Sequence, residues 1–185
     1  MIDDVLLDAE DRMEKAVAAL RRELTTIRTG RAHPGLVEHL RVDYYGAPTP
    51  LNQLATIGVP EPRLLTIQPW DRQSLSAIEK AIQKSDLGLN PMNDGTIIRL
   101  VIPQLTEERR KELVRVVRKK VEEGRVAVRN VRRDCQDELR RLQREKQVSE
   151  DAQYRGQDEL QKLTDRFIQE IDQVGEEKEE ELLAV

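Results

Sequence analysis

Arginines are the residues of this sequence whose type and spacing best suggest a chemical role. Four of them, here called the basic ridge, are separated by seven, four and three residues: Arg118, Arg125, Arg129 and Arg132. This spacing places them along one edge of a helix, and Arg133 adds charge on the adjoining face. A guanidinium group is a planar fork of donors that matches phosphate oxygens, so the ridge could follow a nucleic-acid backbone. The alternative interpretation is a solvated helix face that acidic residues balance within the molecule.

Two features favour RNA as the partner of the basic ridge. Lysine would serve solubility equally well, yet it is absent from Arg125 to Arg144. Arg28 and Arg31 add two further guanidinium groups at the end of the first predicted helix. Few aromatic side chains are available for stacking on bases, so we expect contact with the RNA backbone and recognition of RNA shape.

No set of residues in the sequence predicts catalysis. We find no nucleophile with a matching base, no carboxylate dyad, and no glycine loop with the spacing of a phosphate or dinucleotide site. Cys135 is the single cysteine, which excludes an internal disulfide, and its place on an apolar stripe predicts a buried structural thiol. His33 and His39 do not have the spacing of a metal-binding pair. We therefore expect no enzymatic activity, no metal and no cofactor.

Composition predicts slender, helix-rich domains. Of the 185 residues, 36% are charged and 3% are aromatic, which leaves little bulky material for one large core. The net charge of −4 hides a strong asymmetry, because residues 106–148 carry +6 and residues 149–185 carry −8. No apolar run is long enough to span a bilayer, and the first residues are acidic rather than basic. We expect a cytoplasmic protein that does not enter membranes.

Proline positions divide the chain. All eight prolines fall between Pro34 and Pro103, so residues 1–30 and 106–185 can form uninterrupted helices. Apolar stripes at helical spacing predict one helix up to Gly30, a second over 106–148 of roughly 65 Å, and a third that begins at Ser149. Three such stripes can bury one another in a monomeric, antiparallel three-helix bundle. An intermolecular coiled coil is the alternative.

The central block, residues 31–105, predicts a small α+β domain inserted into the bundle. Four short segments rich in β-branched or aromatic residues predict strands: 36–44, 53–59, 63–68 and 96–101. Leu75, Ile78 and Ile82 predict a short helix capped by Asp71 or Ser74. Two chain crossings would join the insert to the bundle and act as a hinge. We expect the hinge to consist of Gly30, Arg31, Pro103, Gln104, Leu105 and Thr106.

Six blocks of sequence resemble a known family. They run in order along the whole chain: IRTGRA at 27–32, DYYGAPTPLNQLA at 43–55, KAIQKSDLGLNP at 80–91, PQLTEERRKEL at 103–113, RVAVRNVRRD at 125–134 and QKLTD at 161–165. The chain resembles the bacterial ribosome recycling factors. The resemblance implies an L-shaped molecule with an elongated three-helix bundle. The α+β domain inserted into the bundle would have a β/α/β sandwich-like arrangement.

The resemblance also implies a function. After termination, such a factor occupies the large ribosomal subunit across the A and P sites and, with elongation factor G, dissociates the ribosome into subunits. Elongation factor G uses the GTP, so this chain would need no nucleotide. The bundle would lie on large-subunit ribosomal RNA, with Arg132 central and Arg129, Arg28 and Arg31 in support. The family also associates activity with the position of Val117, for which packing is an adequate explanation.

Two other functions remain open on the sequence alone. An adaptor protein would use the basic ridge to bind an acidic protein partner, and strongly salt-dependent RNA binding would argue against it. An RNA-remodelling enzyme is the weaker alternative, because the sequence has no nucleotide-binding motif.

Overall fold

The computed structural model describes residues 1–184, and the chain divides into two compact units. Unit 1 comprises Met1–Leu24 together with the chain from Glu108 onward, and unit 2 comprises Thr25–Glu107. Each unit has a core of its own. Residues 25–30, which the sequence pattern predicts to be part of the bundle, fall in unit 2.

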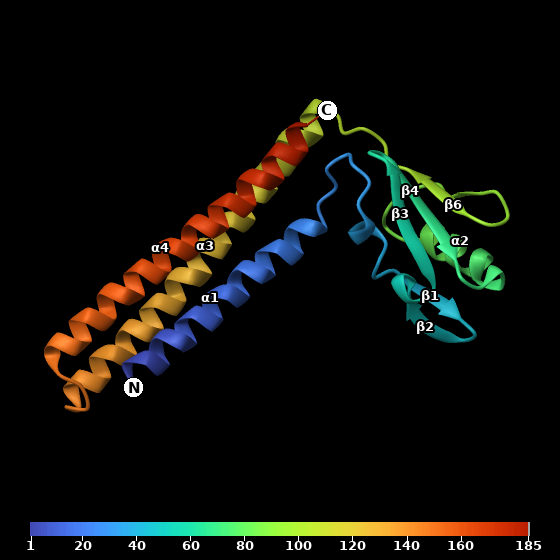
Figure 1. The fold of residues 1–185 in the computed structure, drawn as a ribbon. Coiled ribbons are helices and arrows are strands. Elements are labelled where there is room, and N and C mark those ends of the chain that lie inside the picture. Colours follow the sequence, from blue (N-terminus) through green and yellow to red (C-terminus); the bar gives the residue numbers. More distant parts are fainter. Residues whose placement is uncertain (185) are drawn as a thin grey trace. The chain divides into compact units, whose positions relative to one another are not determined.

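Unit 1 consists of three long helices that lie side by side (Figure 1). They are α1 (Ile2–Thr25), α3 (Glu107–Arg144) and α4 (Glu150–Leu183). The chain runs along α1 and α4 in the same direction and returns along α3, so α3 is antiparallel to both. A three-helix bundle with antiparallel neighbours is therefore confirmed.

The predicted apolar stripes form the core of unit 1. In α3 the stripe is buried from Leu113 to Leu142, and in α4 from Leu160 to Leu182. Cys135 is buried within the α3 stripe, as predicted. Small residues occupy positions where the helices approach closely. At Gly175, for example, a β-carbon would lie 2.6 Å from the side chain of Val121.

The helix ends differ from the predicted ones by a few residues. The first helix ends at Thr25 rather than at Gly30, although Ile27 beyond it is still buried. The second long helix ends at Arg144 rather than at residue 148, because Lys146 has a positive φ of 57° and turns the chain. Its 38 residues make a rod of about 57 Å. Ser149 caps the third helix as predicted, since its hydroxyl accepts a 3.1 Å hydrogen bond from the Ala152 amide.

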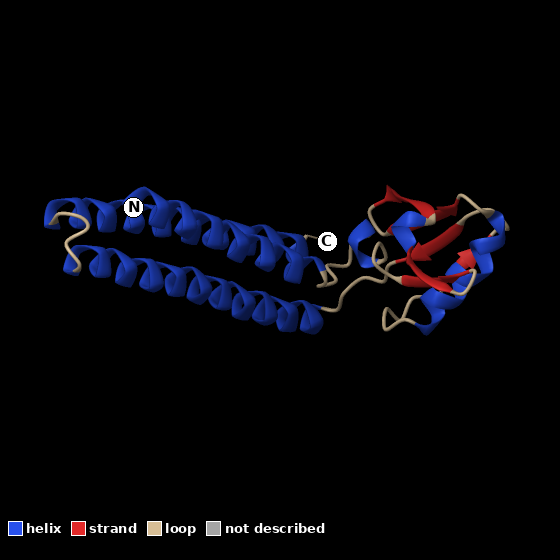
Figure 2. Ribbon diagram, turned by 90° about the horizontal axis from the view of Figure 1, so that it is seen from below, coloured by secondary structure: helices blue, strands red, loops and turns tan. Residues whose placement is uncertain are grey.

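Unit 2 contains two antiparallel sheets, one α-helix and three short 3-10 helices (Figure 2). The smaller sheet pairs β1 (Arg41–Tyr44) with β2 (Ala47–Pro50). The larger sheet has the order β3-β4-β6-β5, and its strands are β3 (Ala55–Glu61), β4 (Leu64–Pro69), β5 (Met92–Asn93) and β6 (Ile98–Val101). Both sheets and the helix α2 (Leu75–Lys84) share one core, to which α2 contributes Ile78 and Ile82. The α+β class is confirmed.

Several predicted strand limits were wrong. The segment 36–44 is a strand only over Arg41–Tyr44, because Pro34–Leu36 forms a 3-10 helix that begins with a proline. Residues 51–53 also form a 3-10 helix, so β3 begins at Ala55 rather than at residue 53. Residues 96 and 97 belong to a turn held by Asp94, so β6 begins at Ile98.

Two strands, β2 and β5, were not predicted from the sequence. The β2 strand carries Pro48 and Pro50, which pair with Asp43 and Arg41 of β1. Proline lacks the amide that an inner strand needs, but β2 is the edge of a two-stranded sheet and tolerates it. The β5 strand has two residues, too few for alternation to be visible.

Candidate nucleic-acid interface

Three arginines of the basic ridge, Arg118, Arg125 and Arg132, lie along the line where α3 faces α4, here called the α3–α4 seam. Arg118 donates from Nε to Glu179 Oε1 over 2.8 Å, and this hydrogen bond raises the pKa of its guanidinium. Arg125 donates from Nε to Asp172 Oδ1 over 2.7 Å, and its Nη2 lies 2.6 Å from the same oxygen in an ion pair. It also donates to Glu122 over 3.0 Å, and the hydrogen bonds to Glu122 and Asp172 raise the pKa of its guanidinium. Acidic side chains of the bundle therefore balance these two arginines.

Arg132 has a different environment on the same seam. Its nearest polar partner on α4 is the neutral amide of Gln161, where Nη1 donates to Oε1 over 3.4 Å. The side chain is half-buried, and its Nε is buried without an acceptor. Within residues 1–184, Arg132 forms no ion pair. No carboxylate of the described residues therefore balances its positive charge on the seam.

Arg129 and Arg133 extend the charge around Arg132. Arg129 is half-buried and lies 3.7 Å from Glu122, a carboxylate that already accepts from Arg125. Arg133 is exposed, and among the described residues it has no ion pair. In the second half of the predicted arginine set on α3, Arg132 and Arg133 therefore have no carboxylate partner among the described residues, and Arg129 shares Glu122 with Arg125.

Arg28 and Arg31 belong to unit 2, unlike the arginines of α3. Arg28 is half-buried and Arg31 is exposed, on either side of the buried Thr29. Their support of Arg132 therefore remains a prediction.

The predicted hinge residues share one corner of unit 2. Gly30 has a φ of +80°, and a β-carbon there would lie 3.6 Å from the backbone nitrogen of Leu105. Just inside this corner, the Ala32 amide donates to Pro62 over 2.7 Å and the Ile102 amide donates to Arg63 over 2.8 Å. Both connecting segments are thus fixed to the turn between β3 and β4. The predicted hinge motion would therefore have to use residues outside these two bonds, namely 25–31 and 103–107.

A polar hollow of about 470 Å³ adjoins Gln161 on the surface of unit 1. Its lining comes from α3 and the first half of α4: Gln136, Tyr154, Arg155, Gln157, Asp158 and Gln161. Amide and hydroxyl groups dominate this lining, so it offers donors and acceptors rather than a single charge. This hollow could not be predicted from the sequence, because its lining residues come together only through the register between α3 and α4.

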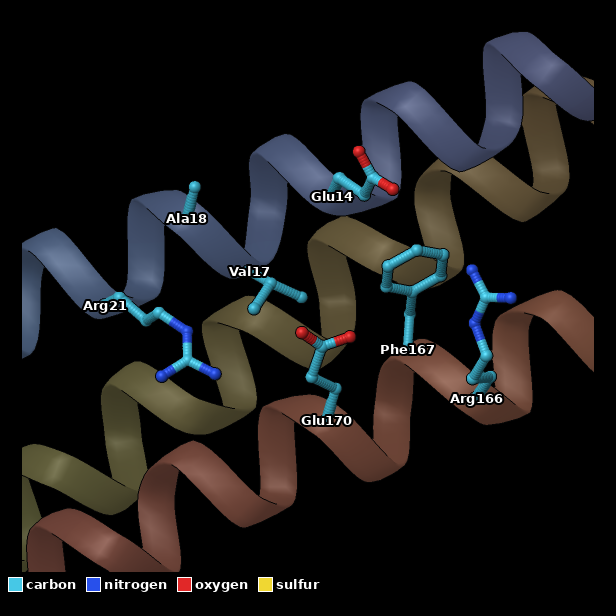
Figure 3. A pocket seen from close by; sticks show the side chains of 7 residues that line it. All are labelled: Glu14, Val17, Ala18, Arg21, Arg166, Phe167 and Glu170. Atoms are coloured by element: carbon cyan, nitrogen blue, oxygen red, sulfur yellow. The ribbon is translucent and has the colours of Figure 1, made fainter.

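A second hollow, of about 300 Å³, lies between α1 and α4 (Figure 3). Its apolar part consists of Val17, Ala18 and the Phe167 ring, and the Arg166 guanidinium lies 4.7 Å from the centre of that ring. Arg166 also pairs with Glu10 over 2.9 Å. Arg21, Glu14 and Glu170 complete a lining of mixed sign, which does not favour an anion.

Residues 1–184 give no support to three further properties: metal binding, a reactive thiol and a membrane-spanning helix. No three His, Cys, Asp or Glu side chains gather there in a way that could hold a metal ion. Burial raises the pKa of the Cys135 thiol, which makes this cysteine a poor nucleophile. No helix in the described part of the chain is long and apolar enough to cross a membrane.

Comparison with known proteins identifies the family. A family model described as ribosome recycling factor matches residues 20–183. This chain belongs to the ribosome recycling factor family. Full-length relatives agree: the ribosome-recycling factor of Carboxydothermus hydrogenoformans is 58% identical, and that of Syntrophomonas wolfei 59%, each over 185 residues and 100% of both chains. The resemblance carried by the six sequence blocks is confirmed.

Solved structures of the family share the fold. A solution structure of the ribosome recycling factor matches with a TM-score of 0.80 and 46% identity, and the match covers 100% of this chain and 98% of the other. A second match has a TM-score of 0.70 and 50% identity over 100% of both chains. It belongs to models of the T. thermophilus ribosome recycling factor and the E. coli elongation factor G bound to the E. coli post-termination complex.

Proposed function

We propose that this protein binds the post-termination ribosome across the A and P sites and, with elongation factor G and GTP, dissociates it into subunits. The ribosome is thereby released from mRNA for another round of translation. The observation that carries this proposal is the 50% identical relative, over its full length, that is bound with elongation factor G to a post-termination complex. Because its substrate is the ribosome, we place the protein in the cytoplasm.

We further propose that unit 1 anchors on large-subunit ribosomal RNA through Arg132, supported by Arg129 and Arg133. These guanidinium groups lie together on α3 and lack the cross-helix ion pairs of Arg118 and Arg125. A phosphate can therefore approach Arg132 and Arg133 without first displacing a carboxylate, and at Arg129 it meets only the 3.7 Å pair with Glu122.

In this proposal the protein does mechanical work and catalyses no reaction. Elongation factor G hydrolyses GTP and supplies the force, and this chain needs no cofactor of its own. A bundle whose three apolar stripes bury one another resists bending and can act as a monomeric lever. Reorientation of unit 2 would use the segments 25–31 and 103–107, which lie outside the hydrogen bonds that fix the rest of the connection.

The first prediction concerns Arg132→Ala. Removal of a charge-assisted contact to phosphate costs ~1.5–3 kcal/mol, so affinity for large ribosomal subunits should fall about tenfold to a hundredfold. Splitting of post-termination ribosomes with elongation factor G and GTP, followed by light scattering, should slow accordingly.

Arg125→Ala is the matched control on the same ridge. Its guanidinium is engaged by Asp172 and Glu122, so its loss should weaken subunit binding less than threefold or so. Circular dichroism must show that both variants keep the helical bundle. Equal losses in both variants, or unchanged splitting by Arg132→Ala, would refute the assigned anchor. Failure of the wild type to bind subunits would refute the proposed function itself.

A further inference from the structure

The ion pairs of the α3–α4 seam follow a regular register. Arg118 faces Glu179, and Arg125 faces Asp172. From the first pair to the second, the chain advances seven residues along α3 and steps back seven along α4, as antiparallel helices require. One further step of seven brings Arg132 opposite Asp165. The register therefore offers Arg132 a carboxylate.

The structure breaks the series at this third step. Arg132 and Asp165 form no ion pair, although both lie within the described residues. Instead Gln161, one helical turn before Asp165, stands between them. Its Nε2 donates to Asp165 Oδ1 over 2.9 Å, and its Oε1 accepts from Arg132 Nη1 over 3.4 Å.

The chemistry of an amide fixes this arrangement. A carboxylate accepts hydrogen bonds and a guanidinium donates them, so only the NH₂ end of Gln161 suits Asp165 and only its carbonyl end suits Arg132. Because α4 holds residues 161 and 165 on one face, four positions apart, their contact is built into the helix. Gln161 thereby satisfies the carboxylate without neutralising the arginine.

We propose that Gln161 is a positioning residue that holds Asp165 away from Arg132 and so keeps the guanidinium available for an RNA phosphate. The proposal rests on the RNA anchor described above and adds the residue that keeps this anchor free. Without the amide, Asp165 becomes the competitor that Glu179 and Asp172 already are for the two preceding arginines.

The contacts of Arg132 suit a side chain that must leave its resting place. Its hydrogen bond to Gln161 is long at 3.4 Å, and weak for that reason. Its buried Nε lacks an acceptor, so the resting position leaves one donor unsatisfied. Arg125, in contrast, would have to give up contacts of 2.6–3.0 Å to two carboxylates. Of these two arginines, Arg132 gives up fewer and weaker hydrogen bonds when it turns toward an external anion.

The other charged groups near Arg132 do not perform the same task. Glu122 lies on α3 and contacts Arg125 and Arg129. Asp158 lies one turn from Gln161 on α4 and lines the polar hollow. Neither carboxylate contacts Arg132, so Asp165 is the carboxylate that the seam register directs at it.

The test compares Gln161→Ala with Gln161→Ala/Asp165→Asn in binding to purified large ribosomal subunits. In the single variant Asp165 is free to pair with Arg132, and affinity should fall about twofold to fivefold, the effect of an exposed ion pair. In the double variant the side chain at position 165 is a neutral amide, and affinity should return to within about twofold of the wild type.

Gln161→Ala/Asp158→Asn is the matched control, since it removes a neighbouring negative charge that the register does not direct at Arg132. It should remain as weak as Gln161→Ala. Equal recovery in both double variants would mean that general repulsion of RNA, not capture of Arg132, explains the effect. Unchanged binding of Gln161→Ala, or no recovery with Asp165→Asn, would also overturn the proposal.

A ribosome-free readout separates this inference from the proposed function. The Nε–H resonance of Arg132, assigned by its loss in Arg132→Ala, should move in Gln161→Ala and return in Gln161→Ala/Asp165→Asn. If these shifts occur but no variant binds subunits, the proposed function fails while the capture of Arg132 stands. In a second case the wild type binds subunits, Arg132→Ala does not bind them, and the resonance moves in neither Gln161 variant. The RNA anchor then stands and the role of Gln161 fails.

Discussion

Asp94 is a single residue that organises the turn between β5 and β6. Its Oδ1 accepts hydrogen bonds from the amides of Ile97 and Thr96, over 2.9 Å and 3.0 Å, and from the Thr96 hydroxyl over 2.9 Å. Its Oδ2 pairs with Arg99 over 2.9 Å. These bonds hold the pKa of Asp94 well below the ordinary value of 3.8, and the hydrogen bond from the Ile97 amide contributes most. The ionised carboxylate is therefore what stabilises the turn.

The prediction at this scale is a pH-dependent loss of stability in Asp94→Ala. Because the folded-state pKa is depressed, the wild type holds its full advantage above about pH 4 and loses it as the pH falls through the folded-state value. Urea unfolding followed by Trp70 fluorescence reports unit 2, where the single tryptophan lies. The variant should unfold at lower urea than the wild type at pH 7, and the gap should narrow at pH 2.

Asp86→Ala is the control for Asp94→Ala. Asp86 is exposed and has no ion pair among the described residues, so its loss should change unfolding little at either pH. A gap between Asp94→Ala and the wild type that stays constant from pH 7 to pH 2 would contradict the role of the ionised carboxylate.

At the scale of elements, helix contacts in unit 1 depend on small residues. Gly175 of α4 faces Val121 of α3, and an added β-carbon would lie 2.6 Å from Val121 Cγ2. Valine is stiff about its first side-chain torsion and cannot easily turn aside. The two helices therefore owe their close approach at this level to the glycine.

The close contact between Gly175 and Val121 can be tested by enlarging the glycine. Gly175→Ala should lower the free energy of unfolding of unit 1 by about 1–2 kcal/mol, because overpacking outweighs the better helix propensity of alanine. Combining it with Val121→Ala should cost less than the sum of the two single changes, since the smaller side chain leaves room for the methyl group. Urea unfolding followed by the helical circular dichroism signal measures both. Strict additivity would show that the two residues do not compete for space.

Helices were easier to predict from the sequence than strands. The long stripes of α3 and α4 repeat often enough to fix each helix and its buried face, including Cys135. The strand β2 was not predicted because prolines such as Pro48 and Pro50 ordinarily interrupt strands. A strand at the edge of a sheet tolerates them, but an edge position is set by the tertiary structure and is not visible in the sequence. The strand β5 was too short to show alternation.

The candidate site was predictable only in its charges. Spacing placed the basic ridge on one edge of α3, but spacing within one helix says nothing about what faces it. The division into balanced Arg118 and Arg125 and unbalanced Arg132 depends on the register between α3 and α4. The role of Gln161 required two interatomic contacts, so no motif search could have found it.

At the scale of the whole molecule, the net charge of −4 opposes binding to RNA, while the local charge favours it. The strongly acidic segment 149–185 directs part of its charge at α3, through Glu179 and Asp172. The arginines that remain unbalanced form a small basic area on an acidic protein. A partner at close range experiences that area more strongly than the screened total.

The corresponding prediction is a modest salt dependence of binding to large ribosomal subunits. If three arginines, Arg129, Arg132 and Arg133, meet phosphates, log affinity should fall with log salt with a slope of about −2 to −3. Arg132→Ala should make the slope shallower by about one. Titration of labelled protein with subunits at several potassium concentrations measures this. A slope near zero would exclude phosphate contacts as the anchor.

The division of the chain into units also orders events during synthesis. Unit 2 is one continuous stretch, Thr25–Glu107, so it can fold as soon as it leaves the exit tunnel. Unit 1 is assembled from both ends of the chain, and α1 must wait through the whole of unit 2 before α3 and α4 emerge to cover its apolar stripe. The helix α1 is thus synthesised well before its partners α3 and α4. Until they emerge, its apolar stripe is exposed on the nascent chain.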